Sequence, residues 1–103
     1  MGKLKGYQRT FLRGSAHKLK PVVFIGQNGL SPAVMKAIDD SLNQHELIKI
    51  KFLDFKEKEA KEKLAADIEK ETGSGMVGMI GHTAIFFRMQ RDPEKRKIIV
   101  PQK

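Results

Sequence analysis

The chain has 103 residues, of which 40% are hydrophobic and 31% are charged, so a single globular domain with its own core is expected. It has no cysteine, which excludes disulfides and thiolate metal sites, and its apolar runs are far too short to span a membrane. The formal net charge is +8, and so basic a balance favours a polyanionic partner, most often a nucleic acid. Because the chain lacks cysteine and any run long enough to span a membrane, we expect a cytoplasmic protein.

The first twenty residues contain no acidic residue. Within them, a basic helix is expected from about Leu4 to Lys18. At 100° per residue, apolar and cationic side chains fall on neighbouring arcs of this helix. The apolar arc, expected to lie in the core, consists of Leu4, Tyr7, Phe11, Leu12 and Leu19. The cationic arc repeats every four residues and consists of Lys5, Arg9, Arg13 and His17.

A strand, a turn and a second helix are predicted next. Residues 22–25 are all β-formers and predict a buried strand, which Pro21 precedes. Residues 26–29, Gly-Gln-Asn-Gly, then form a turn. Ser31 is expected to cap a helix that has Pro32 at its first position. The buried stripe of that helix is expected to be Val34, Ile38 and Leu42.

The second predicted strand, residues 47–53, alternates apolar and basic side chains, which places Lys49 and Lys51 together on one face. A third helix follows at about 56–72, with Gly73 as its C-cap. Its inward residues are expected to be Ala60, Leu64 and Ile68, and its ion pairs Glu57 with Lys61 and Glu59 with Lys63.

Two further strands, residues 76–80 and 83–88, are predicted to form a hairpin around Gly81-His82. The alternation of helices and strands predicts an α/β fold of order αβαβαββ, with a four-stranded mixed sheet packed against helices. We expect one domain over residues 1–90 and a polar basic tail over 91–103. The apolar end of that tail, residues 98–100, either docks on the domain or remains loose.

The spacing Gly-x-x-Gly at Gly26–Gly29 has two interpretations. Two glycines between a strand and a capped helix allow a phosphate backbone to approach the helix N-terminus, as in KH domains. Alternatively, the loop is a tight turn that needs positive φ. Rossmann and P-loop motifs are absent, as is the pattern of an RRM. Phe86 and Phe87 point to opposite faces of their strand, and we expect both to pack in the core.

No catalytic or metal-binding constellation is evident. The three histidines lack metal-ligand spacing, and adjacent Asp39 and Asp40 suit a solvated helix face. We expect no enzyme activity, metal, cofactor or small-molecule substrate. The first helix could instead lie on an anionic membrane, but its apolar arc is more economically buried against the sheet. We expect no membrane partner.

Several segments taken together resemble the YhbY family, the single-domain bacterial relatives of plant-organelle CRM splicing domains. The matching residues are Gln8-Arg9 through Phe11-Leu12-Arg13-Gly14 with Ala16-His17-Leu19, then Pro21-Val22-Val23, and Ile25-Gly26 to Gly29-Leu30-Ser31. The pattern continues in residues 45–51 (HELIKIK) and in Val77-x-x-Ile80-Gly81-His82-Thr83, on to Arg88. The resemblance implies a fold akin to the C-terminal domain of translation initiation factor three. It also implies RNA binding through the Gly26–Gly29 loop and association with large-subunit ribosomal precursors. Gln27 and Asn28 stand where relatives frequently carry basic residues.

The resulting prediction is a non-catalytic, monomeric RNA-binding protein that binds ribosomal RNA and assists ribosome assembly. The predicted RNA-binding residues are Gly26, Gln27, Asn28, Gly29, Lys5, Arg9, Arg13, Lys18, Lys20, Lys49, Lys51 and Arg88. Two alternatives remain open. One is a general or translation-linked RNA chaperone, and the other is an interaction module that docks on a ribosomal protein through the third helix.

Overall fold

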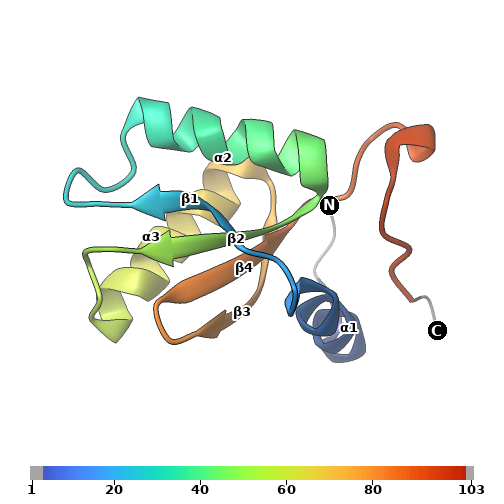
Figure 1. Ribbon diagram of the computed structural model, residues 1–103, viewed down its shortest axis with the longest axis horizontal. Helices are drawn as coiled ribbons and strands as arrows, with labels where there is room; N and C mark the ends of the chain where they lie inside the picture. The colour runs from blue at the N-terminus through green and yellow to red at the C-terminus, as the bar shows by residue number, and fades with distance from the viewer. Residues whose placement is uncertain (1–3, 102–103) are drawn as a thin grey trace.

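A four-stranded mixed sheet lies between two layers of helix in the computed structural model, which describes residues 4–101 (Figure 1). The elements in chain order are α1 (Gly6–Ala16), β1 (Pro21–Ile25), α2 (Pro32–His45), β2 (Leu47–Phe52), α3 (Lys58–Thr72), β3 (Gly75–Ile80) and β4 (Thr83–Phe87). A short 3-10 helix, Pro93–Lys95, follows in the tail. The predicted order αβαβαββ is confirmed.

The strands lie in the order β1-β2-β4-β3. β1 and β2 are parallel and are joined by α2, whereas β4 is antiparallel to both of its neighbours. The predicted hairpin joins β3 to β4, and Gly81 has a φ of 60° in its turn, a left-handed conformation that suits glycine. β1 and β3 are therefore the edge strands.

The larger core lies between the sheet and the layer formed by α2 and α3. Every second residue of β2 points into it, as the alternation predicts, and Ile50 and Phe52 are fully buried there. Ile38 and Leu42 from α2 confirm the predicted helix stripe. Ser31 caps α2 as predicted, because its hydroxyl accepts the N–H of Val34 at 3.2 Å.

The smaller core lies on the other face, under α1. Leu12 and Ala16 of α1 pack there with Leu47, Phe87 and the tail residue Val100. The apolar end of the tail is thus docked rather than loose, and Figure 1 shows the tail at one end of the molecule, running from the level of α2 down to that of α1. The domain division at residue 90 stays a prediction, although Val100 belongs to this core.

Glu46, between α2 and β2, holds the tail in place. It is only 1% exposed, and its φ is 62°. One carboxylate oxygen accepts the backbone N–H of Lys97 at 2.7 Å and of Ile98 at 3.2 Å, and the other accepts that of Gln90 at 2.8 Å. The carbonyl of Glu46 accepts the N–H of Arg88 at 2.9 Å. Backbone amides therefore satisfy this buried carboxylate.

Two expectations about apolar residues were wrong. Phe11 and Leu19 were placed in the core, but each is 39% exposed, and Ala16 lies there instead. β1 was expected to be buried on both faces, but Val22 and Phe24 are exposed. The cause is the same in both cases, since α1 is short and packs over β2, β3 and β4 rather than over β1.

The two ion pairs predicted for α3 are absent within the described residues. Lys61 is nearly buried and donates to the carbonyl of Gly81 at 2.7 Å, so it ties α3 to the β3–β4 turn. Lys63 forms an ion pair with Asp67 at 3.5 Å instead of the predicted pair with Glu59. The C-cap at Gly73 is confirmed by its left-handed conformation.

Candidate nucleic-acid interface

The predicted loop, residues 26–29, joins the end of β1 to the start of α2. Gly29 donates its N–H to the carbonyl of Gly26 at 3.0 Å and closes a tight turn. Its φ is 62°, which glycine adopts without strain. Gly26 has no positive φ, and a Cβ added there would meet no atom within 4 Å. The turn therefore explains Gly29 but not Gly26, and the space beside Gly26 is open to another molecule.

The loop leads directly into the N-terminus of α2. The first turn of that helix has no acidic residue, so no carboxylate of the helix neutralises the positive end of its dipole. The side chains of Gln27 and Asn28 are exposed. This end of the molecule can therefore offer hydrogen bonds and a partial positive charge to an anion.

A second loop lies beside the first. Leu53 and Asp54 donate their backbone N–H groups to the carbonyl of Ile25 at 2.8 and 3.3 Å. The ring of Phe55 lies 3.7 Å from where a Cβ of Gly29 would be. Because Asp54 brings an exposed carboxylate to this end of the sheet, the loop is not strongly cationic. Phosphate neutralisation would have to come from cations elsewhere.

The predicted cations differ in how free their charged groups are. Lys5, Lys18, Lys20 and Lys51 are exposed, and among residues 4–101 their ammonium groups have no hydrogen-bond or ion-pair partner. The charged groups of three others donate to backbone carbonyls, at 2.7 Å for Arg9 to Leu4, 3.2 Å for Arg13 to Val77 and 2.9 Å for Lys49 to Leu19. All seven retain a net charge, because a carbonyl is a neutral partner.

Arg13 reaches from α1 across β3. A Cβ at Gly78 would lie 2.6 Å from Cδ of Arg13, so the absence of a side chain at Gly78 is what lets the arginine lie flat on the strand. The guanidinium of Arg13 also donates to the hydroxyl of Thr10 at 3.2 Å. This cation is therefore fixed at the edge of α1, next to the part of the sheet that α1 leaves open.

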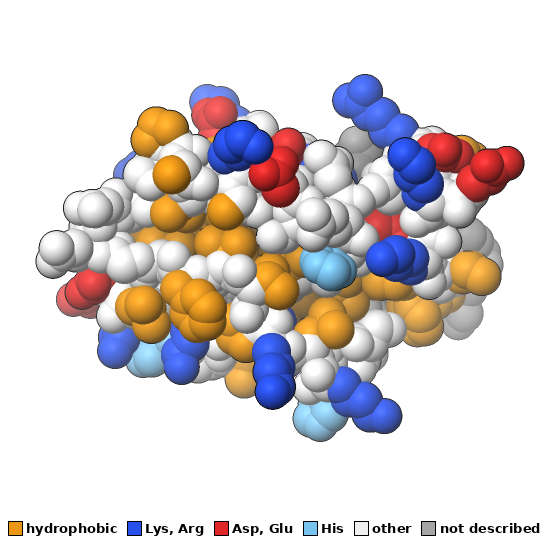
Figure 2. Space-filling view, turned by 45° about the horizontal axis from the view of Figure 1, so that its top comes forward, with side chains coloured by type: hydrophobic (Ala, Val, Ile, Leu, Met, Phe, Trp, Pro, Cys, Tyr) orange, Lys and Arg blue, Asp and Glu red, His pale blue; other side chains and the backbone are white. Residues whose placement is uncertain are grey.

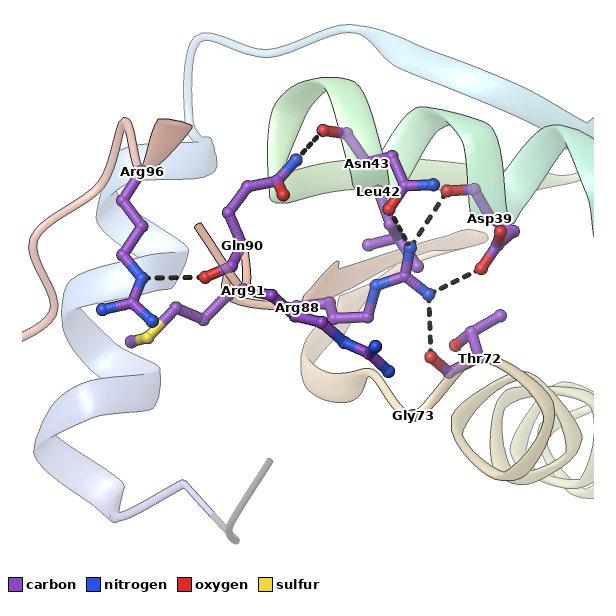
Figure 3. Close-up of a pocket in the computed structure, with 10 residues that line it drawn as sticks. Asp39, Leu42, Asn43, Thr72, Gly73, Arg88, Gln90, Arg91 and Arg96 are labelled. Carbon is purple, nitrogen blue, oxygen red and sulfur yellow. Dashed lines mark hydrogen bonds and ion pairs between the residues drawn. The ribbon is translucent and has the colours of Figure 1, made fainter. Parts of the chain in front are cut away.

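Arg88 lies apart from the other predicted residues. Figure 3 shows it in a cavity of about 600 Å³ between α2 and the end of α3. Its guanidinium pairs with the carboxylate of Asp39 at 2.6 Å and donates to the carbonyl of Thr72 at 2.8 Å and the amide oxygen of Asn43 at 2.8 Å. The side chain is only 19% exposed. These contacts give Arg88 a structural role at the end of the sheet opposite the glycine loop.

Sequence reasoning missed Phe24, which lies on β1 two residues before the loop and is 50% exposed. In the register of the sheet it stands opposite Lys51. The signal that could have found it is the alternation in β2, where Lys49 and Lys51 share a face that cannot be fully buried. A strand beside these lysines can therefore expose residues on that same face, as β1 does at Val22 and Phe24.

Charge is distributed unevenly over the molecule. None of the four strands contains an acidic residue, and neither does α1. Figure 2 shows basic side chains along both margins of the face in view and hydrophobic side chains between them, while most of the acidic side chains in view lie along the upper margin and at the two ends. The structure thus brings most predicted cations to the α1 side of the sheet.

Within residues 4–101 no group of three or more His, Cys, Asp or Glu side chains is placed to hold a metal ion. No helix in the described part of the chain is long and apolar enough to cross a membrane.

The model of the CRS1 / YhbY (CRM) domain matches residues 4–88. The chain belongs to this family. The match begins at Leu4 and ends at Arg88, so it takes in α1, the glycine loop, the whole sheet and the arginine that follows β4.

Several known proteins resemble the chain over most of their length. It is 40% identical over 103 residues to an RNA-binding protein of Haemophilus influenzae, with all of both chains covered. It is 34% identical to YqeI of Bacillus subtilis, named a probable RNA-binding protein, covering 95% of this chain and 99% of that one. A solution structure of the hypothetical protein SAV1595 from Staphylococcus aureus, proposed to bind RNA, has a TM-score of 0.82 at 32% identity and covers 96% and 100% of the two chains.

Proposed function

We propose that this protein binds RNA without catalysing a reaction on it. The observation that carries the proposal is the set of uncompensated cations on the α1 side of an acid-free sheet, which ends at an open glycine loop. Phosphates are the ligands that such a surface attracts. The names of the CRM-family relatives in Haemophilus influenzae and Bacillus subtilis support the choice of RNA as the polyanion.

The finer proposal is that the RNA is ribosomal and belongs to precursors of the large subunit in the cytoplasm, whose assembly the monomeric protein assists. It rests on the resemblance to the YhbY family and on the basic surface. Sedimentation of cell extracts through a gradient tests it. Co-migration with large-subunit precursors that mild RNase treatment abolishes is the expected result. Co-migration that survives the RNase would indicate docking on a ribosomal protein instead.

The surface also makes a quantitative prediction for purified protein and single-stranded RNA. If about four phosphates are neutralised, log affinity should fall against log salt with a slope near −3, at ~0.7 per phosphate. Fluorescence anisotropy at several salt concentrations measures this slope. A flat response would contradict the electrostatic basis of the proposal.

The loop is tested by adding negative charge to it. Replacing Gln27 and Asn28 by Asp keeps both glycines and the cap of α2, so the free energy of unfolding should change by less than ~1 kcal/mol. RNA affinity should nevertheless fall about tenfold, or about 1.4 kcal/mol, because two carboxylates would stand where a phosphate binds.

A matched control changes the net charge by the same amount far from the loop. Ala66→Asp with Lys70→Gln alters two exposed positions of α3 and also lowers the net charge by two units. This variant should bind RNA nearly as the unmodified protein does. Equal losses in the two variants would mean that the loop is only a turn and that overall charge governs binding.

A further inference from the structure

One row of the sheet is open to solvent on the α1 side. In register across the four strands, Phe24 stands opposite Lys51, Lys51 opposite Thr83, and Thr83 opposite Ile80. Phe24 on the edge strand β1 is 50% exposed, and Ile80, the last residue of the edge strand β3, is 68% exposed. At about 4.8 Å between strands, the row extends over roughly 14 Å.

The row is open because α1 covers only the other half of this face. The buried residues of α1 pack against Leu47 at the start of β2 and Phe87 at the end of β4. The glycine loop follows the opposite end of β1. Figure 1 shows α1 near one end of the strands and the loop beyond the other, with this face of the sheet between them. The direct path of an RNA strand from the loop to the α1 cations crosses the open row.

The chemistry of the row suits an unpaired nucleotide. Phe24 offers an aromatic face, and Lys51 on the next strand offers an ammonium group with no partner among the described residues. The next apolar residue of β1 on this face, Val22, lines a cavity of about 510 Å³ together with Leu19, Lys20 and Lys97. Aromatic and apolar surface beside free cations is what single-stranded nucleic acids bind, because bases stack while phosphates pair.

A protein partner fits less well. Protein interfaces are depleted of lysine at their centres, whereas a lysine stands in the middle of this row. A strongly acidic partner is excluded from the apolar positions by the cost of burying its charges. Bases and phosphates of one strand satisfy the apolar and the cationic residues together.

We infer that the open row is a stacking site for an unpaired base of single-stranded RNA, with Phe24 as the platform and Lys51 as a phosphate contact. The inference rests on the proposed RNA binding and goes beyond it, because it gives the protein a preference for unpaired over duplex RNA. The bound strand continues from Phe24 to the glycine loop on one side and toward Lys20 on the other.

The test compares two replacements of Phe24 that differ in stacking. Phe24→Leu keeps an apolar side chain but removes the aromatic face, while Phe24→Tyr keeps both. With oligouridylate of about twelve nucleotides as the probe, Phe24→Leu should weaken binding about tenfold, since stacking contributes that much per base. The salt slope should not change. Phe24→Tyr should bind as the unmodified protein does, and binding of a blunt RNA duplex should be the same for all three.

A direct readout uses the absence of tryptophan from the chain. Phe24→Trp places a single indole on the platform, and its fluorescence should be quenched when oligouridylate saturates the protein. Ile99→Trp is the control, because Ile99 is 89% exposed in the tail and outside the row. Its fluorescence should not respond to the RNA.

The outcomes separate this inference from the proposed function. If the unmodified protein binds neither oligouridylate nor duplex RNA, the proposed function fails. If it binds RNA, but Phe24→Leu is equally tight and Phe24→Trp is not quenched, the stacking site is wrong and RNA binding stands. If Phe24→Leu binds RNA tightly but no longer associates with a protein of ribosomal particles that the unmodified chain binds, the row is a protein-docking site instead.

Discussion

The two ends of the sheet differ in how their polar groups are satisfied. At the end where β4 finishes, Arg88 and Glu46 are engaged by partners within the chain, and little of either is exposed. At the other end, and on the open face beside it, Lys51 has a free ammonium group and Gln27 and Asn28 face solvent. Residue type alone does not distinguish a structural cation from a binding one, whereas the partners of its charged group do.

The comparison predicts its largest effect at Glu46. Replacing Glu46 by Ala leaves three backbone N–H groups without their acceptor, and at about 1 kcal/mol each the free energy of unfolding should fall by about 3 kcal/mol. Urea unfolding measures the loss, and hydrogen exchange at Lys97 should accelerate. RNA affinity at a temperature where the variant is folded should be unchanged. Glu71→Ala, at an exposed position of α3, is the control and should cost less than ~0.5 kcal/mol.

Arg88→Met should have an intermediate effect on stability. The carbonyl of Thr72 and the carboxylate of Asp39 would lose their donor, but because Asp39 is half exposed, water compensates in part. We expect a loss of about 1–2 kcal/mol in urea unfolding and no loss of RNA affinity. Lys18→Met, matched in charge, should show the reverse pattern. If Arg88→Met kept full stability and bound RNA weakly, the arginine would belong to the interface after all.

The smallest effects are expected at the two glycines of the loop, and they should differ in kind. Gly29→Ala forces a left-handed residue with a Cβ and should cost about 1 kcal/mol of stability. Gly26→Ala should leave stability within ~0.5 kcal/mol, because its backbone is unstrained and its surroundings are empty. It should nonetheless weaken RNA binding about fivefold by keeping the RNA backbone at a distance. Unchanged RNA binding by Gly26→Ala would show that Gly26 takes no part in the interface.

The sequence predicted the order of the elements because period and capping are local properties. The stripe of α2, the cap at Ser31 and the alternation in β2 each depend on residues a few positions apart, and all three are confirmed. The exposure of Phe24 could not be predicted in this way. Alternation shows which residues share a face, but the packing of α1 decides whether that face is covered.

Long-range partners account for the rest of what the sequence missed. Glu46 follows a helix and would ordinarily be solvated, but segments about fifty residues later supply its amide donors. The pairing of Arg88 with Asp39 could not be foreseen because it spans forty-nine positions, and the role of Arg88 in RNA binding stays a prediction. The loop was correctly located by its glycines, and its role in binding stays a prediction.

The smaller core joins the beginning of the fold to its end. Leu12 packs in the same cluster as Val100, and the side chain of Gln8 donates to the carbonyl of Pro101 at 3.1 Å. During synthesis on the ribosome, α1 leaves the exit tunnel first, yet its apolar side has no complete partner until residue 100 has also emerged. The larger core needs only residues up to β4, so it can form earlier. Closure under α1 therefore follows formation of the larger core, and removal of the segment that contains Val100 would leave a folded sheet with one incomplete face.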